Sequence, residues 1–278
     1  GGDEVLDNFF GDPARVTGRG EESIRNGMML HALTVRADLF KDETALDLAE
    51  GMANHPLGLS RYFNWNGEFF GHVHSAVWVA CGLARLGRML SNRFYIEQAN
   101  RIFTYVKAES SEFGWVPEYG QWQPRSDRFC ETCCIKDMIE CACELIECGF
   151  DYWDLVSKFA RNQLAENQIK DGCFISEDNT KEDKNGYTWK NMSRRVVGGW
   201  SGGAEPNSIS LLKFRSIAGC CVGTAPQALQ LVWDRIIISK DGIVTINMPI
   251  DRKSGLADVE TGYPNDGFIR VVARKARA

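Results

Sequence analysis

The chain has 278 residues, of which 44% are hydrophobic and 25% charged, an ordinary composition for a globular protein. Its net charge of −5 argues against the basic surface with which proteins bind nucleic acid or anionic membranes. No apolar run is long enough to span a bilayer, and the first residues do not resemble a signal peptide. We therefore expect a cytoplasmic protein unless a leader has been removed. The sequence carries no signal from which an oligomeric state can be predicted.

Helical periodicity dominates the chain as far as about residue 170. Apolar residues recur at steps of three and four in segments joined by short connections, which is typical of antiparallel helical hairpins. Helices are expected at residues 21–40, 43–54, 72–90, 95–107, 131–148 and 152–169. On the fifth of these, the side chains predicted to face solvent are Lys136, Asp137, Glu140, Glu144 and Glu147.

The pattern changes after residue 170. Residues 171–217 are rich in Gly, Asn, Ser and Asp, which predicts a long irregular loop of the kind that is often functional. One more helix is expected at about 221–235. It is followed by strand-like runs separated by Asp-Gly turns, at 243–250, 255–261 and 267–275.

These patterns predict two regions. Residues 1–240 are expected to form a helical catalytic domain that contains the loop 171–217. Residues 241–278 are expected to begin a β-sandwich-like domain that is truncated here, because three strands make only a thin sheet.

Ten cysteines are many for a chain of this length. Four of them follow one another at steps of four and seven and so form a stripe along one helix, at Cys130, Cys134, Cys141 and Cys148. Such a stripe is typical of packing, because free cysteine behaves as a small buried hydrophobe. Cysteines adjacent in sequence pair poorly, which argues against a disulfide within Cys220-Cys221.

Two short stretches, CETCC at 130–134 and GCCVG at 219–223, are also compatible with a metal site. Thiolates favour zinc, which takes four ligands in a tetrahedron. The pair at 220–221 precedes a predicted helix, whose N-terminus is expected to lower a thiol pKa. Glu131 and Cys133 are two residues apart at a helix start, and they face one side only if the first turn is irregular.

Spacing alone leaves three interpretations of these cysteines open. They can be core packing, or a catalytic zinc or thiolate centre. They can also be a structural zinc site with four cysteine ligands, formed by Cys130, Cys133, Cys220 and Cys221.

Three motifs occur in an order that carries a resemblance. The chain has GHVHSA at 71–76, Glu-Thr-Cys at 131–133 and Cys-Cys at 220–221. This order resembles glycoside hydrolase family 127, the zinc-dependent β-L-arabinofuranosidases, whose first motif is Gly-His-Ala-Val-Arg-Ala. The resemblance covers roughly residues 70–240. It implies a mainly α fold, an (α/α)6-type toroid expected to be incomplete in this chain, followed by a short antiparallel β region.

The resemblance also implies an activity. The chain would be a retaining glycosidase that acts on a carbohydrate, cleaving a terminal furanoside such as a β-L-arabinofuranoside or a related sugar. The residues expected to bind Zn²⁺ are Glu131, Cys133, Cys220 and Cys221, and Cys220 would attack the anomeric carbon. Zinc keeps a thiol deprotonated at neutral pH, and a thiolate is a strong nucleophile. The scheme departs from the usual pair of carboxylates.

The remaining roles are assigned by the same resemblance. Glu118 is the expected general acid, with Glu112 as the alternative in the same loop. His72 matches the family histidine that lines the sugar site, and His74 lies two residues further on. Aromatic rings stack on sugar faces, so we expect Trp115 and, from the long loop, Trp200 to contact substrate, with Tyr119, Trp122 and Glu205 as further candidates.

Two other functions remain open. One is a non-catalytic carbohydrate-binding or structural toroid protein with a structural zinc or packed cysteines. The other is a metal-free lyase- or hydratase-like enzyme that uses His72 and Glu118, whose activity would survive Cys220→Ala. The chain also departs from the family after its cysteine pair, where Val222-Gly223-Thr224 replaces Pro-Pro-Asn.

Overall fold

The computed structural model describes residues 21–59, 62–69, 71–120, 130–175, 179, 181–186, 188–202 and 219–274. Its helices are α2 (Glu21–Phe40), α3 (Glu43–Asn54), α4 (Val73–Leu90), α5 (Arg93–Glu109), α6 (Thr132–Glu147), α7 (Trp153–Phe159), α8 (Met192–Arg195) and α9 (Gly219–Ile236), with π-helical turns η3 (His55–Leu59) and η5 (Ala160–Leu164). Its strands are β1 (Gly71–His72), β2 (Tyr119–Gly120), β3 (Ile237–Lys240), β4 (Ile243–Ile246), β5 (Arg252–Lys253), β6 (Ala257–Thr261) and β7 (Ile269–Ala273).

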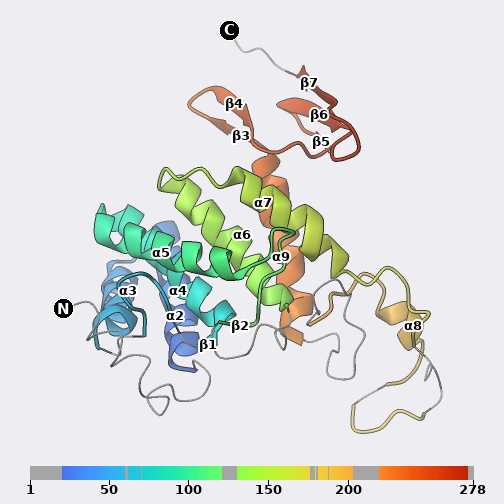
Figure 1. Ribbon diagram of the computed structural model, residues 1–278, viewed down its shortest axis with the longest axis horizontal. Helices are drawn as coiled ribbons and strands as arrows, with labels where there is room; N and C mark the ends of the chain where they lie inside the picture. The colour runs from blue at the N-terminus through green and yellow to red at the C-terminus, as the bar shows by residue number, and fades with distance from the viewer. Residues whose placement is uncertain are drawn as a thin grey trace.

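Helix α4 lies at the centre of the helical part (Figure 1). It packs against α2, α5 and α6, while α3 pairs with α2, and α6 packs in turn against α7 and α9. Small residues allow the close approach of α2 and α4, because a Cβ on Gly27 would lie only 2.7 Å from the carbonyl oxygen of Ser75. The predicted helices therefore assemble through neighbouring hairpins, as their spacing indicates.

Local signals end and begin these helices close to the expected places, although α5 extends two residues further at each end than predicted. The carboxylate of Asp42 caps α3 by accepting a bond from the amide of Ala45 at 3.0 Å. Ser91 adopts the left-handed conformation that closes α4, and Asn92 then caps α5 through the amide of Phe94. These two residues form the short turn that makes α4 and α5 an antiparallel pair.

The predicted solvent face of α6 is confirmed at Glu147, which is exposed, and is wrong for three of its other residues. Lys136, Asp137 and Glu144 are buried at 2%, 0% and 5% exposure. Periodicity failed here because α6 is covered on several sides, by α4, α5, α7 and α9, so that its charged residues need partners inside the protein. Asp137 pairs with His74, and Glu144 accepts a bond from Arg85 at 2.6 Å.

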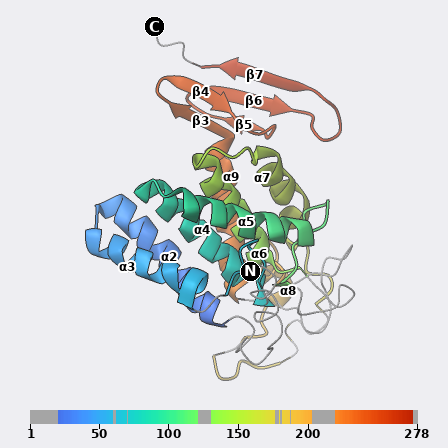
Figure 2. The same ribbon diagram turned by 60° about the vertical axis from the view of Figure 1, so that its left-hand side comes forward.

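Strands β3 to β7 form a separate group beyond α7 and α9 (Figure 2). β3 and β4 make an antiparallel hairpin, and β5, β6 and β7 make a three-stranded antiparallel sheet. The strand predicted at 243–250 ends at Ile246, and its partner β3 was missed because the apolar run 236–238 resembles the end of a helix. The expected fold class, mainly α with a short antiparallel β region, is confirmed.

A two-stranded ribbon positions the residues around the predicted site. β1 and β2 pair antiparallel, with His72 opposite Tyr119. The described part of the long loop contains the short helix α8, and residues 203–218 lie outside the described residues. Residues 121–129, which include Trp122, also lie outside them. Among the described helices, none combines the length and the apolar character needed to cross a membrane. The division at residue 240 into two domains remains a prediction.

Candidate metal and active site

Glu131 is the residue directly before α6. Its backbone is extended, with φ −110° and ψ 130°, whereas Thr132 is already helical. This change of direction allows Glu131 and Cys133 to face the same side of the chain. The predicted irregularity is therefore the ordinary bend at the start of a helix.

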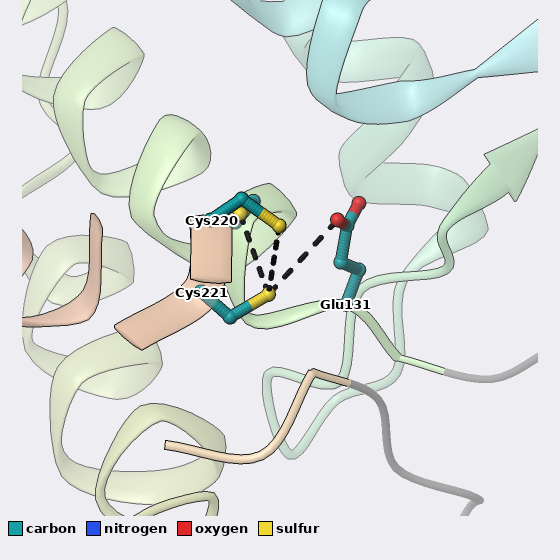
Figure 3. A group of neighbouring side chains, drawn as sticks. Glu131, Cys220 and Cys221 are labelled. Carbon is teal, nitrogen blue, oxygen red and sulfur yellow. Dashed lines mark hydrogen bonds between the residues drawn. The ribbon is translucent and has the colours of Figure 1, made fainter. Parts of the chain in front are cut away.

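The first turn of α9 supplies two more sulfur atoms to the same place. The Sγ of Cys221 lies 3.4 Å from that of Cys133 and 3.8 Å from that of Cys220. Figure 3 shows the side chain of Glu131 pointing toward Cys221, whose Sγ lies 4.0 Å from Oε1. One ligand atom from each of the four residues lies within 4.8 Å of the others. Helix packing of α6 on α9 thus assembles the predicted ligand set.

The four side chains differ in their access to solvent. Cys133 and Cys221 are fully buried and Glu131 is 8% exposed, whereas Cys220 is exposed. Only Cys220 of this set can therefore be reached readily by a substrate.

Burial and mutual contact disfavour negative charge on these thiols. The contact with the Cys221 sulfur, and then burial, raise the pKa of Cys133 far above its ordinary value. Burial, with the nearby Cys133 sulfur, also raises the pKa of Cys220. The expectation that the α9 N-terminus would lower this pKa is thus wrong for the protein alone. Three sulfurs and a carboxylate are a donor set that suits zinc, whose charge favours thiolates.

The second oxygen of Glu131 is held by other partners. Nε2 of His72 lies 2.9 Å from Oε2, and the thiol of Cys134 donates to the same oxygen at 3.3 Å. Nδ1 of His72 lies 3.0 Å from the hydroxyl of Ser75. These contacts leave Oε1 directed at the sulfurs. Cys134 is buried, as predicted, and it also helps to orient this carboxylate.

Glu118 lies beside the same carboxylate. Its backbone carbonyl accepts a bond from the amide of Val73 at 2.8 Å, which fixes the end of β2 against the start of α4. Its carboxylate, with ligand atoms of His72 and Glu131, forms a second group within 4.8 Å. Glu112 instead lies fully exposed and pairs with Lys158 at 3.4 Å. Of the two predicted acids, the structure brings only Glu118 to the site.

A buried polar network that the sequence did not reveal contacts Thr132, in the segment that carries two predicted metal ligands. The hydroxyl of Thr132 donates to the backbone carbonyl of Ser201 at 2.6 Å and accepts from the side-chain amide of Asn167 at 2.9 Å. The backbone amide of Ser201 closes the ring by donating to the backbone carbonyl of Asn167. Because Thr132 lies between two predicted ligands, this network fixes both. Its only signal in the sequence is a threonine between a glutamate and a cysteine.

The other predicted sugar-binding residues lie in defined surroundings. His74 pairs with Asp137 and its ring lies 4.9 Å from that of Trp78. Trp200 is buried and its indole donates to the carbonyl of Leu164 at 3.0 Å, and Trp115 is 8% exposed. The substrate roles of these three remain predictions. Glu205 lies outside the described residues.

Cys130 does not join the metal group. It is fully buried, its sulfur lies 4.0 Å from the side-chain amide of Asn167, and burial raises its pKa to about 12. The group of four that the structure brings together contains Glu131 in its place. This favours the mixed carboxylate and thiolate set over the alternative with four cysteines.

No protein-family profile and no curated protein sequence matches the chain. Solved structures do match it. A GH127 β-arabinofuranosidase, BT3674, aligns with a TM-score of 0.62 and 20% identity over 87% of this chain. A GH127 β-L-arabinofuranosidase from Geobacillus stearothermophilus T6 aligns with a TM-score of 0.55 and 14% identity over 86% of this chain.

The chain spans 39% and 43% of the lengths of these two proteins. At this low identity, the similarity concerns the fold. The predicted resemblance to family 127 and the α/α-toroid type of architecture are therefore confirmed as structural similarity.

Proposed function

We propose that the chain carries the active site of a retaining glycoside hydrolase whose nucleophile is a zinc-bound cysteine. One observation carries the proposal: a donor set of three thiols and one carboxylate is assembled on a fold shared with two GH127 enzymes. The substrate would be a terminal furanoside, such as a β-L-arabinofuranoside or a related sugar.

The solvent exposure of the four side chains indicates different roles for them. Glu131, Cys133 and Cys221 are buried and would hold Zn²⁺, while Cys220 would bind it and remain open to substrate. Zinc, when bound, would supply the positive charge that keeps the thiols deprotonated near neutral pH. Cys220 is then the thiolate available for attack.

The residues of the chain can carry out both halves of the reaction. The sulfur of Cys220 forms a bond to the anomeric carbon while the bond to the leaving oxygen breaks, and Glu118 gives its proton to that oxygen. The Glu118 carboxylate then takes a proton from water, whose oxygen displaces the sulfur from the same carbon. Two displacements at one carbon preserve its configuration.

The position of Glu118 is consistent with the role of acid. It directly precedes β2, and its carboxylate lies within 4.8 Å of ligand atoms of His72 and Glu131. Glu131 also belongs to the group that contains the proposed nucleophile Cys220, so the acid and the nucleophile share one neighbouring carboxylate. His72, half-buried beside Glu118, would contact the sugar, and His74, Trp115 and Trp200 remain the further candidates.

The test is a panel of aryl glycosides given to the full chain with zinc. We expect hydrolysis with retention, and for Cys220→Ala a loss of at least about a thousandfold, because removing the nucleophile of a hydrolase costs at least this much. Cys143→Ser, which changes a buried thiol outside the cluster, should remain active.

Two results would contradict the proposal. Activity that survives Cys220→Ala would indicate metal-free chemistry by His72 and Glu118. A wild-type chain that binds zinc yet cleaves none of the glycosides would indicate a structural site in a carbohydrate-binding or structural protein.

A further inference from the structure

The carboxylate of Glu131 faces two different groups of donors. Oε1 is directed at the sulfur of Cys221, at 4.0 Å, and Oε2 lies 2.9 Å from Nε2 of His72. Glu118 completes a second group with His72 and Glu131, in which the three ligand atoms lie within 4.8 Å of one another. The carboxylate of Glu131 thus belongs both to the group with three cysteines and to a group of nitrogen and oxygen donors.

We propose that His72, Glu118 and Glu131 bind a second divalent cation, with Glu131 bridging it to the thiolate-bound ion. An imidazole and two carboxylates suit Zn²⁺, Co²⁺ or Mn²⁺. Zinc binds nitrogen and oxygen at about 2.0–2.2 Å in a tetrahedron, so two ligand atoms of one ion lie roughly 3.3–3.6 Å apart. The three donors lie within 4.8 Å of one another, so their side chains need to shift by at most about 1.5 Å to share an ion.

The partner of the other imidazole nitrogen supports this site. Nδ1 of His72 lies 3.0 Å from the hydroxyl of Ser75, which can accept its proton. A cation bound by both Nε2 and Oε2 of Glu131 would favour that tautomer, because it would replace the proton that Nε2 otherwise donates to this oxygen. A metal-binding histidine commonly donates its second nitrogen to a partner in this manner, which fixes the ring and raises its basicity.

The backbone holds the three donors in place and leaves them open to water. His72 belongs to β1 and pairs with Tyr119 of β2, next to Glu118, and the amide of Val73 binds the Glu118 carbonyl. Glu131 is fixed at the start of α6. His72 and Glu118 are half-buried, so water can complete the coordination of a cation bound here.

A cation at this position would bind the proposed general acid. Excess zinc would then inhibit hydrolysis, an expectation that rests on the proposed function. Glu118 cannot give a proton to the leaving oxygen while it coordinates a metal. Occupation of the second site would regulate the activity that the first site supports.

The experiment measures zinc binding to the full chain by equilibrium dialysis and metal analysis. We expect two zinc ions per wild-type chain, bound with different affinities. Glu118→Gln keeps the size of the side chain and removes its charge. It should lower the affinity for the second zinc ion by at least about tenfold. Loss of a group that only supports a metal ligand already costs this much. The matched control is Glu112→Gln, which changes an exposed carboxylate and should bind as wild type does.

Cobalt distinguishes the two sites without any activity assay. A cobalt–thiolate site absorbs strongly by charge transfer, and a site of nitrogen and oxygen ligands does not. We expect Glu118→Gln to keep this absorption and Cys221→Ser to weaken it, because one of the three sulfurs is lost, while still binding a cation at the second site. A single zinc per wild-type chain, or equal weakening by Glu118→Gln and Glu112→Gln, would overturn the second site and leave the thiolate site intact.

Discussion

The sulfur atoms of Cys133 and Cys221 lie 3.4 Å apart, although 88 positions separate the two residues in the chain. Neither atom has access to solvent, and the packing of α6 on α9 brings them together. Two buried thiols in contact gain little from each other, whereas two thiolates there would require a cation. This contact is therefore the sharpest point at which to test metal binding.

We predict that Cys133→Ser removes the stabilisation of the chain by zinc. A ligand present at a hundred times its dissociation constant stabilises the folded wild type by about 2.7 kcal/mol, and the variant should lose most of this gain because a serine oxygen is a poor zinc ligand. The measurement is urea unfolding with and without zinc. Cys143→Ser also replaces a buried thiol, and should keep the full response. An equal response in both variants would count against the site.

The supporting network gives a second prediction. Thr132→Val keeps the shape of the side chain but leaves the carbonyl of Ser201 without its 2.6 Å bond from Thr132, and the amide of Asn167 without its 2.9 Å bond to that hydroxyl. We expect a loss of about 1–3 kcal/mol in the free energy of unfolding, the cost of unsatisfied buried groups. Zinc affinity should fall about 10–100-fold, because the segment between two ligands is no longer fixed. Titration of zinc against a competing chelator measures this zinc affinity.

The matched control for this change is Thr34→Val. Thr34 is equally buried, and its hydroxyl bonds only to the carbonyl of His31 in its own helix, away from the cysteines. Zinc affinity should be unchanged there. If Thr132→Val binds zinc as tightly as the wild type, the network serves stability alone.

The ligand set could be predicted from the sequence, and its surroundings could not. The resemblance to family 127 singled out Glu131, Cys133, Cys220 and Cys221, which the structure brings together as a group that could hold a metal ion, and helix periodicity placed α6 and α9. The contacts that orient Glu131 depend on pairs far apart in sequence, such as His72, which lies 59 positions away. Such contacts leave no local periodic signal, because they are set by the packing of α4 on α6.

The same limit explains the misplaced charges on α6. Periodicity assigns Lys136 and Asp137 to the exterior because charged residues normally face water. A helix surrounded by other helices has no such exterior, and its charges are retained only when they are paired. The raised pKa of Cys133 follows from its contact with the Cys221 sulfur and from burial, and that of Cys220 from burial, and a helix N-terminus in the sequence reveals neither.

Excess zinc should inhibit the proposed hydrolysis. We predict that activity is highest at one zinc per chain and falls as the site of His72, Glu118 and Glu131 fills. An aryl glycoside with a very good leaving group needs no acid for the first step. With that substrate, Glu118→Gln should still release the aryl group in a single turnover, and excess zinc should not slow it. Inhibition that persists in Glu118→Gln would place the inhibitory ion elsewhere.

The last prediction concerns the buried Lys136. Its side chain is 2% exposed, pairs with Glu140 and Asp137, and lies 4.9 Å from the ring of Trp78. Lys136→Met leaves two carboxylates in the interior without this cation. We expect a loss of about 3–5 kcal/mol in the free energy of unfolding at pH 7, as for other broken buried pairs. Lys158→Met, at an exposed ion pair with Glu112, should change it by less than about 0.5 kcal/mol.

The pH dependence of that loss has a definite sign. Burial favours neutral Glu140, but the charge of Lys136 overcomes this and lowers the Glu140 pKa below its ordinary 4.5. A lowered carboxyl pKa contributes stability that is present above 4.5 and is lost as the pH falls through the folded value. The difference in the free energy of unfolding between wild type and Lys136→Met should therefore narrow as the pH is lowered from 4.5 through the folded value of Glu140, measured by urea unfolding. A difference that stays constant or widens would show that the pair with Glu140 is not its source.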